Sequence, residues 1–235
     1  MRTVDGSLTM TAHPFGGYAS KIQLQVTSLF NFGYAGRDSA VTLGHIQELV
    51  QLGLPAPTTV PAVFPIPPSG VTTGTEIVVA GAETYGEIEY ALFLTEEFGW
   101  LVSVASDHSD FVVEKISTSR SKAICPDVVS PDCWLLSDIE DHWDLLELTC
   151  SRFSPVKEVV QAGKVSSLLA PAELIRILEG RVGRSLEVGT VVLSGTIAGE
   201  PRPGAEAWQV QLHDPQLGRV LLHEYQVVVL PDELV

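Results

Sequence analysis

The sequence Gly86-Glu87-Ile88-Glu89-Tyr90 opens one run of alternating residues, and Ser106-Asp107-His108-Ser109-Asp110 closes the next run. In a β-strand, residues two apart point to the same face. Glu87 and Glu89 are therefore predicted to project together, and Asp107 lies at the end of the following strand. The pattern predicts two antiparallel strands that gather three carboxylates in one small volume.

Three neighbouring carboxylates repel one another unless a proton or a cation lies between them. Mg²⁺ or Mn²⁺ accepts an all-oxygen set of ligands and keeps waters that a substrate can displace, whereas Zn²⁺ is expected to recruit His or Cys. The sequence therefore indicates a Mg²⁺ or Mn²⁺ site at Glu87, Glu89 and Asp107. The alternative interpretation is a set of solvent-facing acids on an amphipathic hairpin, because Glu-x-Glu is a common pattern.

Composition narrows the class of protein. The chain has 235 residues, of which 45% are hydrophobic and 18% charged, and its net charge is −15, which favours a globular protein and excludes nucleic acid as a partner. Neither a signal peptide nor a run long enough to span a membrane is apparent. The three cysteines show no disulfide or zinc-binding spacing, so we expect a cytoplasmic protein that does not bind membranes.

The organisation along the chain is simple. Residues 1–17 are rich in Gly, Thr, Ser and Pro and are predicted to form a flexible leader, followed by one domain over residues 18–235. Strand patterns dominate that domain and helices are few and short, which predicts a mixed α+β fold. The clearest strand patterns cover residues 21–32, 76–82, 87–95, 100–105, 188–194, 208–213 and 219–230.

A helix is predicted at about residues 39–52 from the spacing of its apolar residues. It places His45 and Glu48 at positions i and i+3, on adjoining positions of one face. A histidine in such a place is commonly a surface or core residue. His45 is therefore a candidate catalytic residue only if it faces the acid cluster.

Five motifs occur in a characteristic order. Glu87-x-Glu89 and Asp107 are followed by Lys122 with Cys125-Pro126 and by Gly195-Thr196-Ile197-Ala198-Gly199, and Asn31-Phe32-Gly33-Tyr34 and His45-Ile46-Gln47-Glu48 lie upstream. Together they resemble the fumarylacetoacetate hydrolase superfamily, and more closely a largely uncharacterised bacterial and fungal subgroup of it. The resemblance covers about residues 30–215. It implies a strand-dominated β-roll or sandwich of the fumarylacetoacetase C-terminal domain type.

The sequence departs from that family in three places. Only 17 residues separate Glu89 from Asp107, so a connecting helix is expected to be missing. His45 lies further from its Asn-Tyr-like element than in relatives. Asp107 is followed by His108-Ser109-Asp110 without the family's Arg. The metal-binding triad is therefore better supported than the His–Glu pair.

The resemblance also implies a role for each site residue. Glu87, Glu89 and Asp107 would bind the metal, and Lys122 would offset negative charge that develops on the substrate oxygen. His45, oriented by Glu48, would take a proton from water. Substrate contacts are expected from Arg37, Tyr34, Thr196 and the backbone of Gly195, although a surface ion pair of Arg37 with Asp38 or Glu48 is the alternative.

The implied reaction is hydrolysis of a C–C bond in an acylpyruvate-like β-diketo acid through a metal-stabilised enolate. The same set of residues also supports a decarboxylase, isomerase or dehydratase acting on a 2-oxo acid or sugar acid. A third interpretation is a binding or scaffold protein that keeps the fold without turnover. Relatives form dimers through this domain, so the resemblance also implies a homodimer with a small oxo acid as its substrate.

Overall fold

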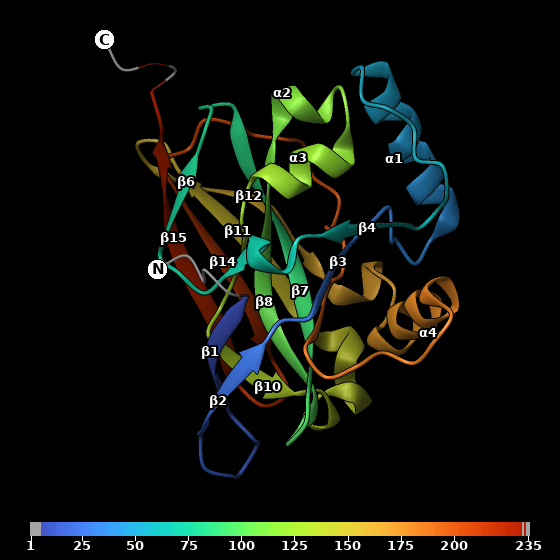
Figure 1. Cartoon of the computed structure of the whole chain (residues 1–235), viewed down its shortest axis with the longest axis vertical. Coiled ribbons are helices and arrows are strands. Elements are labelled where there is room, and N and C mark those ends of the chain that lie inside the picture. The colour runs from blue at the N-terminus through green and yellow to red at the C-terminus, as the bar shows by residue number, and fades with distance from the viewer. Residues whose placement is uncertain (1–5, 232, 234–235) are drawn as a thin grey trace.

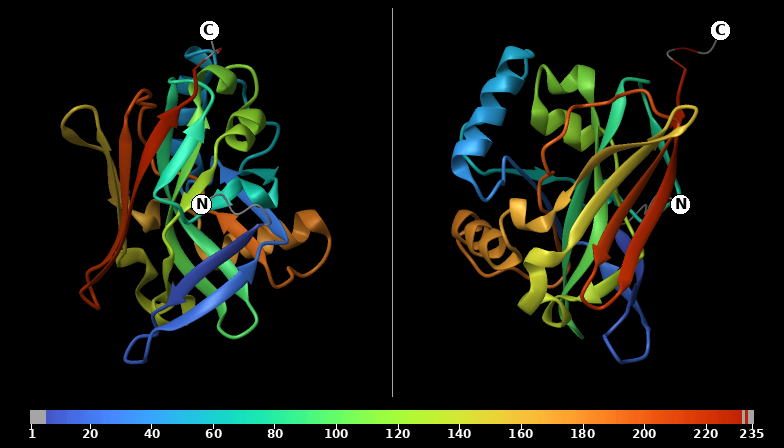
Figure 2. Two further views of the ribbon diagram at one scale, coloured as in Figure 1. Left: turned by 60° about the vertical axis from the view of Figure 1, so that its left-hand side comes forward. Right: turned by 180° about the vertical axis from the view of Figure 1, so that it is seen from behind.

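The computed structural model describes residues 6–231 and 233 and contains two β-sheets with helices at their margins (Figures 1 and 2). In the larger sheet, strands follow the order β2-β1-β10-β8-β7-β13-β3-β4, with β5 and β9 attached beside β8. The smaller sheet has the order β12-β11-β14-β15-β6. The strand-dominated mixed fold predicted from the sequence is therefore confirmed.

The element bounds are as follows. The strands are β1 (Ser7–Ala12), β2 (Ser20–Gln25), β3 (Ser28–Gly33), β4 (Ala62–Ile66), β5 (Val71–Thr72), β6 (Glu76–Val79), β7 (Thr84–Thr95), β8 (Gly99–Asp110), β9 (Asp127–Val129), β10 (Asp132–Leu135), β11 (Glu147–Phe153), β12 (Lys157–Lys164), β13 (Thr190–Leu193), β14 (Ala207–Asp214) and β15 (Arg219–Val229). The helices are α1 (Ser39–Gln51), α2 (Phe111–Glu114), α3 (Thr118–Ile124) and α4 (Pro171–Val182), with short 3₁₀ turns η1 (Pro68–Gly70), η2 (Leu136–Asp138), η3 (Glu140–Leu145) and η4 (Val165–Ser167).

The long hairpin of β7 and β8 is the centre of the larger sheet. Its two strands pair antiparallel along their whole length, from Thr84 opposite Asp110 to Thr95 opposite Gly99. The connection between them is a short turn, so the helix expected to be missing between Glu89 and Asp107 is indeed missing. Because the pairing continues to Asp110, Asp107 lies inside β8 and is held rigidly by strand hydrogen bonds.

Each face of this hairpin packs in a different core. Ile88, Tyr90 and Leu92 of β7 belong to the core between the two sheets, together with Trp208 and Tyr225 of the smaller sheet. On the opposite face, Ala91 and Phe93 belong to a second core, and Glu87 and Glu89 continue that same face. The period-two pattern of β7 therefore places two carboxylates at the end of an apolar surface.

Gly86 marks a close approach of the two sheets. A Cβ atom at this position would lie 2.6 Å from both the Ser106 Oγ and the Tyr225 hydroxyl oxygen, and 3.2 Å from the Trp208 ring. Only glycine lets β7 pass this close to the smaller sheet. The glycine that opens the acidic stretch therefore serves packing between the sheets.

The N-terminal segment corrects one prediction. Residues 7–12 form β1, which pairs antiparallel with β2 and parallel with β10, so the flexible leader predicted over residues 1–17 is wrong for this part. Leu8, Met10 and Ala12 alternate with polar residues and are buried in the second core. That alternation, rather than the overall composition, governs the segment. Residues 1–5 of the predicted leader lie outside the described residues.

The helices lie along one side and one end of the molecule. Figure 1 shows α1 and α4 on the side away from β15, and α2 and α3 near the upper end of β8. Helix α1 confirms the helix predicted at residues 39–52, and α4 ends in a left-handed cap at Gly183. Within the described residues, none of the helices has the length and apolar composition needed to cross a membrane.

Candidate metal centre and cavity

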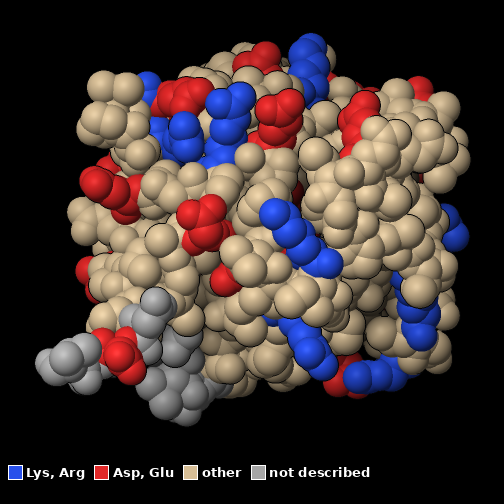
Figure 3. All heavy atoms as spheres, turned by 90° about the horizontal axis from the view of Figure 1, so that it is seen from above, with Lys and Arg blue, Asp and Glu red and all other residues tan. Residues whose placement is uncertain are grey.

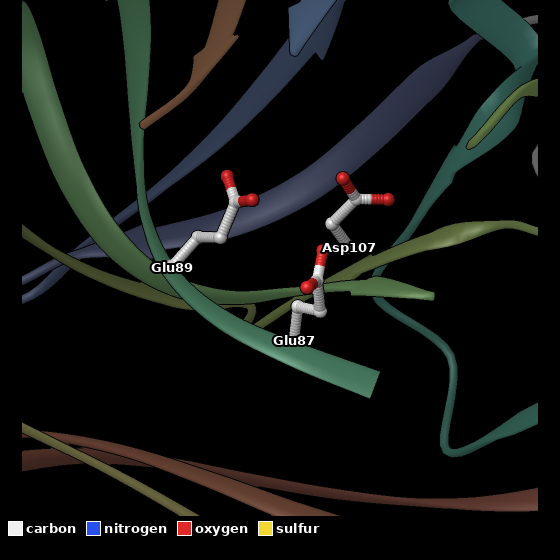
Figure 4. Close-up of side chains that lie close together, drawn as sticks. All are labelled: Glu87, Glu89 and Asp107. Carbon is white, nitrogen blue, oxygen red and sulfur yellow. The ribbon is translucent and has the colours of Figure 1, made fainter. Parts of the chain in front are cut away.

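Strand pairing brings the three predicted carboxylates together. Glu87 of β7 lies directly opposite Asp107 of β8, and Glu89 follows on the same face of β7. One oxygen from each carboxylate lies within 4.8 Å of the other two, and the three side chains point toward one another (Figure 4). Glu89 and Asp107 are fully buried, so the alternative of solvent-facing acids on a surface hairpin is wrong.

The Glu89 carboxylate has one satisfied and one unsatisfied oxygen. The backbone N–H of Gly195 donates to Oε2 at 2.8 Å, while Oε1 is buried and has no hydrogen-bond partner among the described residues. Burial raises the pKa of Glu89 well above its usual value, and the nearby Asp107 carboxylate raises it further. A buried oxygen that accepts no hydrogen bond lowers the stability of the fold unless a ligand binds to it.

Lys122 supplies the positive charge beside the triad. Its ammonium group contacts the Asp107 carboxylate directly and lies 3.6 Å from Glu87 Oε2. Burial alone would lower the pKa of Lys122, but the Asp107 and Glu87 carboxylates outweigh it and raise that pKa well above its usual value. The short helix α3, which carries Lys122 in its last turn, therefore delivers a permanent cation to a buried acidic site.

The donor set fits a hard divalent cation. All three groups are carboxylates, which Mg²⁺ and Ca²⁺ prefer, and one buried oxygen of Glu89 has no hydrogen-bond partner among the described residues. Two oxygens on opposite sides of Ca²⁺ are about 5 Å apart, and on opposite sides of Mg²⁺ about 4 Å. The three ligand oxygens all lie within 4.8 Å of one another, which is close enough for one divalent cation of either kind to contact all three.

A cavity of about 140 Å³ opens beside Glu87 and Glu89. Its volume is close to that of a cavity of about 150 Å³ that binds benzene. His45, Tyr34 and Thr196 line it together with Lys122, so these predicted residues meet around one space. Glu114, Thr118 and several apolar side chains complete the wall.

His45 reaches this cavity from α1. Asp38 begins the helix by accepting hydrogen bonds from the backbone N–H groups of Ala40 and Val41, at 2.8 and 3.1 Å. The His45 Nδ1 lies 3.6 Å from Glu48 Oε2, and the Glu48 side chain is 76% exposed. The predicted His–Glu pair is thus present, with His45 on the cavity side and Glu48 on the solvent side.

Tyr34 has an unusual backbone conformation beside the same cavity. Its φ is +56°, in the left-handed region that bulky residues rarely adopt. Burial raises the pKa of its hydroxyl, which hydrogen-bonds to Thr118, and Glu114 raises that pKa further. Such strain is concentrated at functional sites, where the surrounding structure holds the residue in place.

Two predicted substrate contacts, Arg37 and the Gly195 N–H, have other partners in the structure, whereas Thr196 lines the cavity. Arg37 does not line the cavity: its two terminal nitrogens donate to the Asp144 carboxylate at 2.8 Å each. The Gly195 N–H donates to the Glu89 carboxylate, and the Thr196 hydroxyl donates to the Ile88 carbonyl at 2.9 Å. Gly195 therefore positions a carboxylate, because the loop after β13 packs against β7.

Sequence reasoning also missed five buried polar residues. Tyr85 donates its hydroxyl proton to Glu114 Oε2 at 2.6 Å, and Asn31 donates to Asp127 Oδ1 at 3.0 Å. Burial raises the pKa of Asp127 well above its usual value, and the Asp107 carboxylate adds to this effect. Gln161 accepts from the backbone N–H of Ile88 at 3.0 Å and so braces the strand between the two glutamates.

A signal for two of these residues was present in the sequence. Asp127 directly follows Cys125-Pro126, and Asn31 opens the Asn31-Phe32-Gly33-Tyr34 motif. Neither motif shows that β3 and β9 would bring the two side chains together. Gln161 lies in β12 of the other sheet and had no local signal.

Solved structures share this fold at low sequence identity. The crystal structure of Cg1458 has a TM-score of 0.61 at 16% identity, covering 91% of this chain and 83% of that chain. The apo form of 2-keto-3-deoxy-D-arabinonate dehydratase has a TM-score of 0.62 at 19% identity, with coverages of 88% and 74%. 4-Oxalocrotonate decarboxylase from Pseudomonas putida G7, complexed with magnesium and adipate, has a TM-score of 0.59 at 12% identity, with coverages of 85% and 77%.

These likenesses establish the fold and match the fumarylacetoacetase-type architecture expected from the sequence. No curated protein matches the sequence. A family model does match, over residues 32–225, which is most of the chain and includes all the candidate site residues. The chain therefore belongs to the DUF2848 family, described as a protein family of unknown function.

Proposed function

We propose that this chain is a divalent-metal-dependent enzyme that cleaves a C–C bond in an acylpyruvate-like β-diketo acid by hydrolysis. The observation that carries the proposal is the cluster of Glu87, Glu89 and Asp107, in which one buried Glu89 oxygen has no hydrogen-bond partner among the described residues; the cluster lies beside a cavity lined by Lys122 and His45. Burying neighbouring carboxylates destabilises a protein without a ligand, whereas a bound cation and an anionic substrate would balance their charge.

Glu87, Glu89 and Asp107 would hold Mg²⁺ or Mn²⁺, and the decarboxylase of similar fold was crystallised with magnesium. When bound, the cation supplies Lewis-acid polarisation of a carbonyl oxygen. Gly195 fixes the Glu89 carboxylate through its N–H, and pairing of β7 with β8 fixes Asp107 opposite Glu87. The ligand geometry is thus preorganised by backbone contacts.

Lys122 and His45 would act on the substrate itself. The buried Lys122 ammonium offsets negative charge that develops on the carbonyl oxygen in a site with little water. His45 accepts a proton from water, whose oxygen bonds to the carbonyl carbon; the adjacent C–C bond breaks and its electron pair passes to the departing carbon, which is then protonated. Glu48 stabilises the protonated imidazole across 3.6 Å.

A lyase is the second candidate, because two of the proteins of similar fold are named as a dehydratase and a decarboxylase. Decarboxylation of a 2-oxo acid needs the cation and Lys122 but no attacking water. His45→Gln is therefore expected to abolish hydrolysis of an acylpyruvate and to spare decarboxylation. Isomerisation, and a scaffold role without turnover, are the remaining alternatives, and homodimer formation stays a prediction.

The test begins with metal binding. After treatment with a chelator, titration calorimetry with Mg²⁺ and Mn²⁺ compares the wild type with Glu89→Gln, which keeps the shape of the side chain. Micromolar binding that the substitution abolishes supports the metal site, and equal binding by both proteins, or binding by neither, refutes it. Turnover of acetylpyruvate and oxaloacetate by the metal-loaded wild type then separates hydrolase from decarboxylase. Absence of turnover in a panel of oxo acids favours the scaffold interpretation.

A further inference from the structure

We infer that the substrate is a 2-oxo monoacid with an uncharged, apolar tail, and that the cavity discriminates against a second carboxylate. This inference rests on the proposed function, because it concerns the part of the substrate that lies away from the metal ligands. Three independent features of the cavity support it: its charge, the composition of its wall and the position of Arg37.

The acidic end of the cavity already holds an excess of negative charge. Glu87, Glu89 and Glu114 line it, and Asp107 lies against Lys122. Among the cavity-lining residues in the described part of the chain, Lys122 is the single Lys or Arg, and two carboxylates already engage its ammonium group. One substrate carboxylate can bind to the cation, but a second would find no unpaired Lys or Arg to receive it.

The wall away from the triad is apolar. It is formed by Val41, Leu49, Phe64, Leu168 and Ile197, which come from α1, β4, the end of η4 and the loop after β13. Helix α1 contains Glu48 as its one formally charged residue, and Figure 3 shows tan surface with scattered charged side chains on the side where Figure 1 places α1. A carboxylate enclosed here would lose hydration and would find no Lys or Arg among the described residues of this wall, only the polar side chains of Thr42, His45 and Ser167.

Arg37 is held away from the substrate. Its terminal nitrogens bind both Asp144 oxygens, and its Nε donates to the Leu168 carbonyl at 3.2 Å. All three donor nitrogens of the guanidinium group are thereby engaged in a fixed geometry. The arginine nearest in sequence to the Tyr34 loop therefore braces the wall and leaves the tail pocket uncharged.

The inference is tested with a pair of ligands of matched shape. 5-Methyl-2-oxohexanoate and 2-oxoglutarate share the 2-oxo acid group and have the same number of heavy atoms, but they end in an isopropyl group and a carboxylate. Calorimetric titration of the Mg²⁺-loaded wild type is expected to show about tenfold or greater preference for 5-methyl-2-oxohexanoate. Equal or tighter binding of 2-oxoglutarate would overturn the inference and leave the proposed function standing. Binding of neither ligand, with Mg²⁺ still bound, would overturn both.

Two variants separate the cavity from the general charge of the protein. Val41 and Leu43 are both exposed on α1, but only Val41 lines the cavity. Val41→Arg is expected to reduce the preference for the apolar ligand at least about threefold by giving 2-oxoglutarate a cation, whereas Leu43→Arg leaves the preference unchanged. Equal shifts in both variants would show that the charge of the cavity wall does not govern selection.

Discussion

At the scale of single residues, the Lys122 ammonium group lies beside the carboxylates that would bind a metal ion. Its ammonium group contacts Asp107 and lies close to Glu87, so part of the negative charge of the triad is balanced without a metal. A divalent cation must then bind beside a fixed positive charge, which costs affinity. In the proposed function, Lys122 would therefore weaken metal binding while stabilising negative charge on the substrate.

Lys122→Met is accordingly expected to bind Mg²⁺ more tightly than the wild type, by several-fold, while losing about 100-fold or more in turnover. Calorimetry and an activity assay on the same preparations measure both effects. Lys115→Met is the control, because Lys115 lies over the Phe111 ring and does not line the cavity. Weaker Mg²⁺ binding by Lys122→Met would show that the lysine supports the ligands instead of competing with the metal.

The metal site is also expected to depend on pH. Burial raises the pKa of Glu87 from 4.5 to about 8 in the metal-free protein, although Lys122 lowers it in part. Below that pKa the Glu87 carboxyl group carries a proton that the metal must displace, so the contribution of Glu87 to affinity rises with pH up to about 8 and then levels off. Titrations between pH 6.5 and 9 are expected to show up to tenfold tighter binding per pH unit below the plateau, with proton release. Affinity that is constant over this range would contradict a protonated Glu87.

At the scale of elements, the loop after β13 holds Glu89, the proposed metal ligand, through the Gly195 N–H. Gly195 has φ +81°, and a Cβ atom there would lie 3.2 Å from the Phe32 carbonyl oxygen. Only glycine combines this left-handed backbone with close packing against β3. The N–H that binds Glu89 is therefore placed by a conformation that an L side chain would disturb.

Gly195→Ala is expected to lower the free energy of unfolding by about 1–3 kcal/mol and to weaken Mg²⁺ binding, because Glu89 loses its fixed orientation. Urea denaturation and calorimetry measure the two effects. Gly204→Ala is a matched control: its φ of +83° is nearly the same, but a Cβ atom there would have no neighbouring atom within 4 Å. If both variants lose stability and only Gly195→Ala loses metal, the loop has the positioning role assigned to it.

At the scale of the whole molecule, metal binding and folding are coupled, because the unfolded chain does not hold the three carboxylates together. At a Mg²⁺ concentration of about 100 times its dissociation constant, folding is stabilised by about 2.7 kcal/mol. For a chain of this length that corresponds to a rise in Tm of roughly 5–10 °C. Calorimetric melting with Mg²⁺ and with chelator checks this, and Glu89→Gln is expected to melt at the same temperature in both.

Much of this architecture follows from local patterns. The alternation in residues 87–95 and 100–105 predicts β7 and β8, and the apolar spacing of residues 39–52 predicts α1. The same alternation places Glu87 and Glu89 on one face, so two thirds of the acid triad required no knowledge of tertiary contacts. The prediction of a flexible leader is wrong for residues 7–12, because the alternation of Leu8, Met10 and Ala12 with polar residues forms a strand despite the Gly- and Ser-containing composition.

The hydrogen-bond partners of the polar side chains depend on contacts between segments that are distant in the sequence. The sequence by itself determined the residue types, the side of β7 on which the carboxylates lie and the motifs that resemble an enzyme family. Only the tertiary structure decided that Arg37 binds Asp144, that Gly195 binds Glu89 and that Asn31 binds Asp127. The physical reason is that a polar side chain takes whichever partner folding brings within hydrogen-bond distance, and these partners lie about 100 residues apart in the chain, beyond the reach of any local pattern.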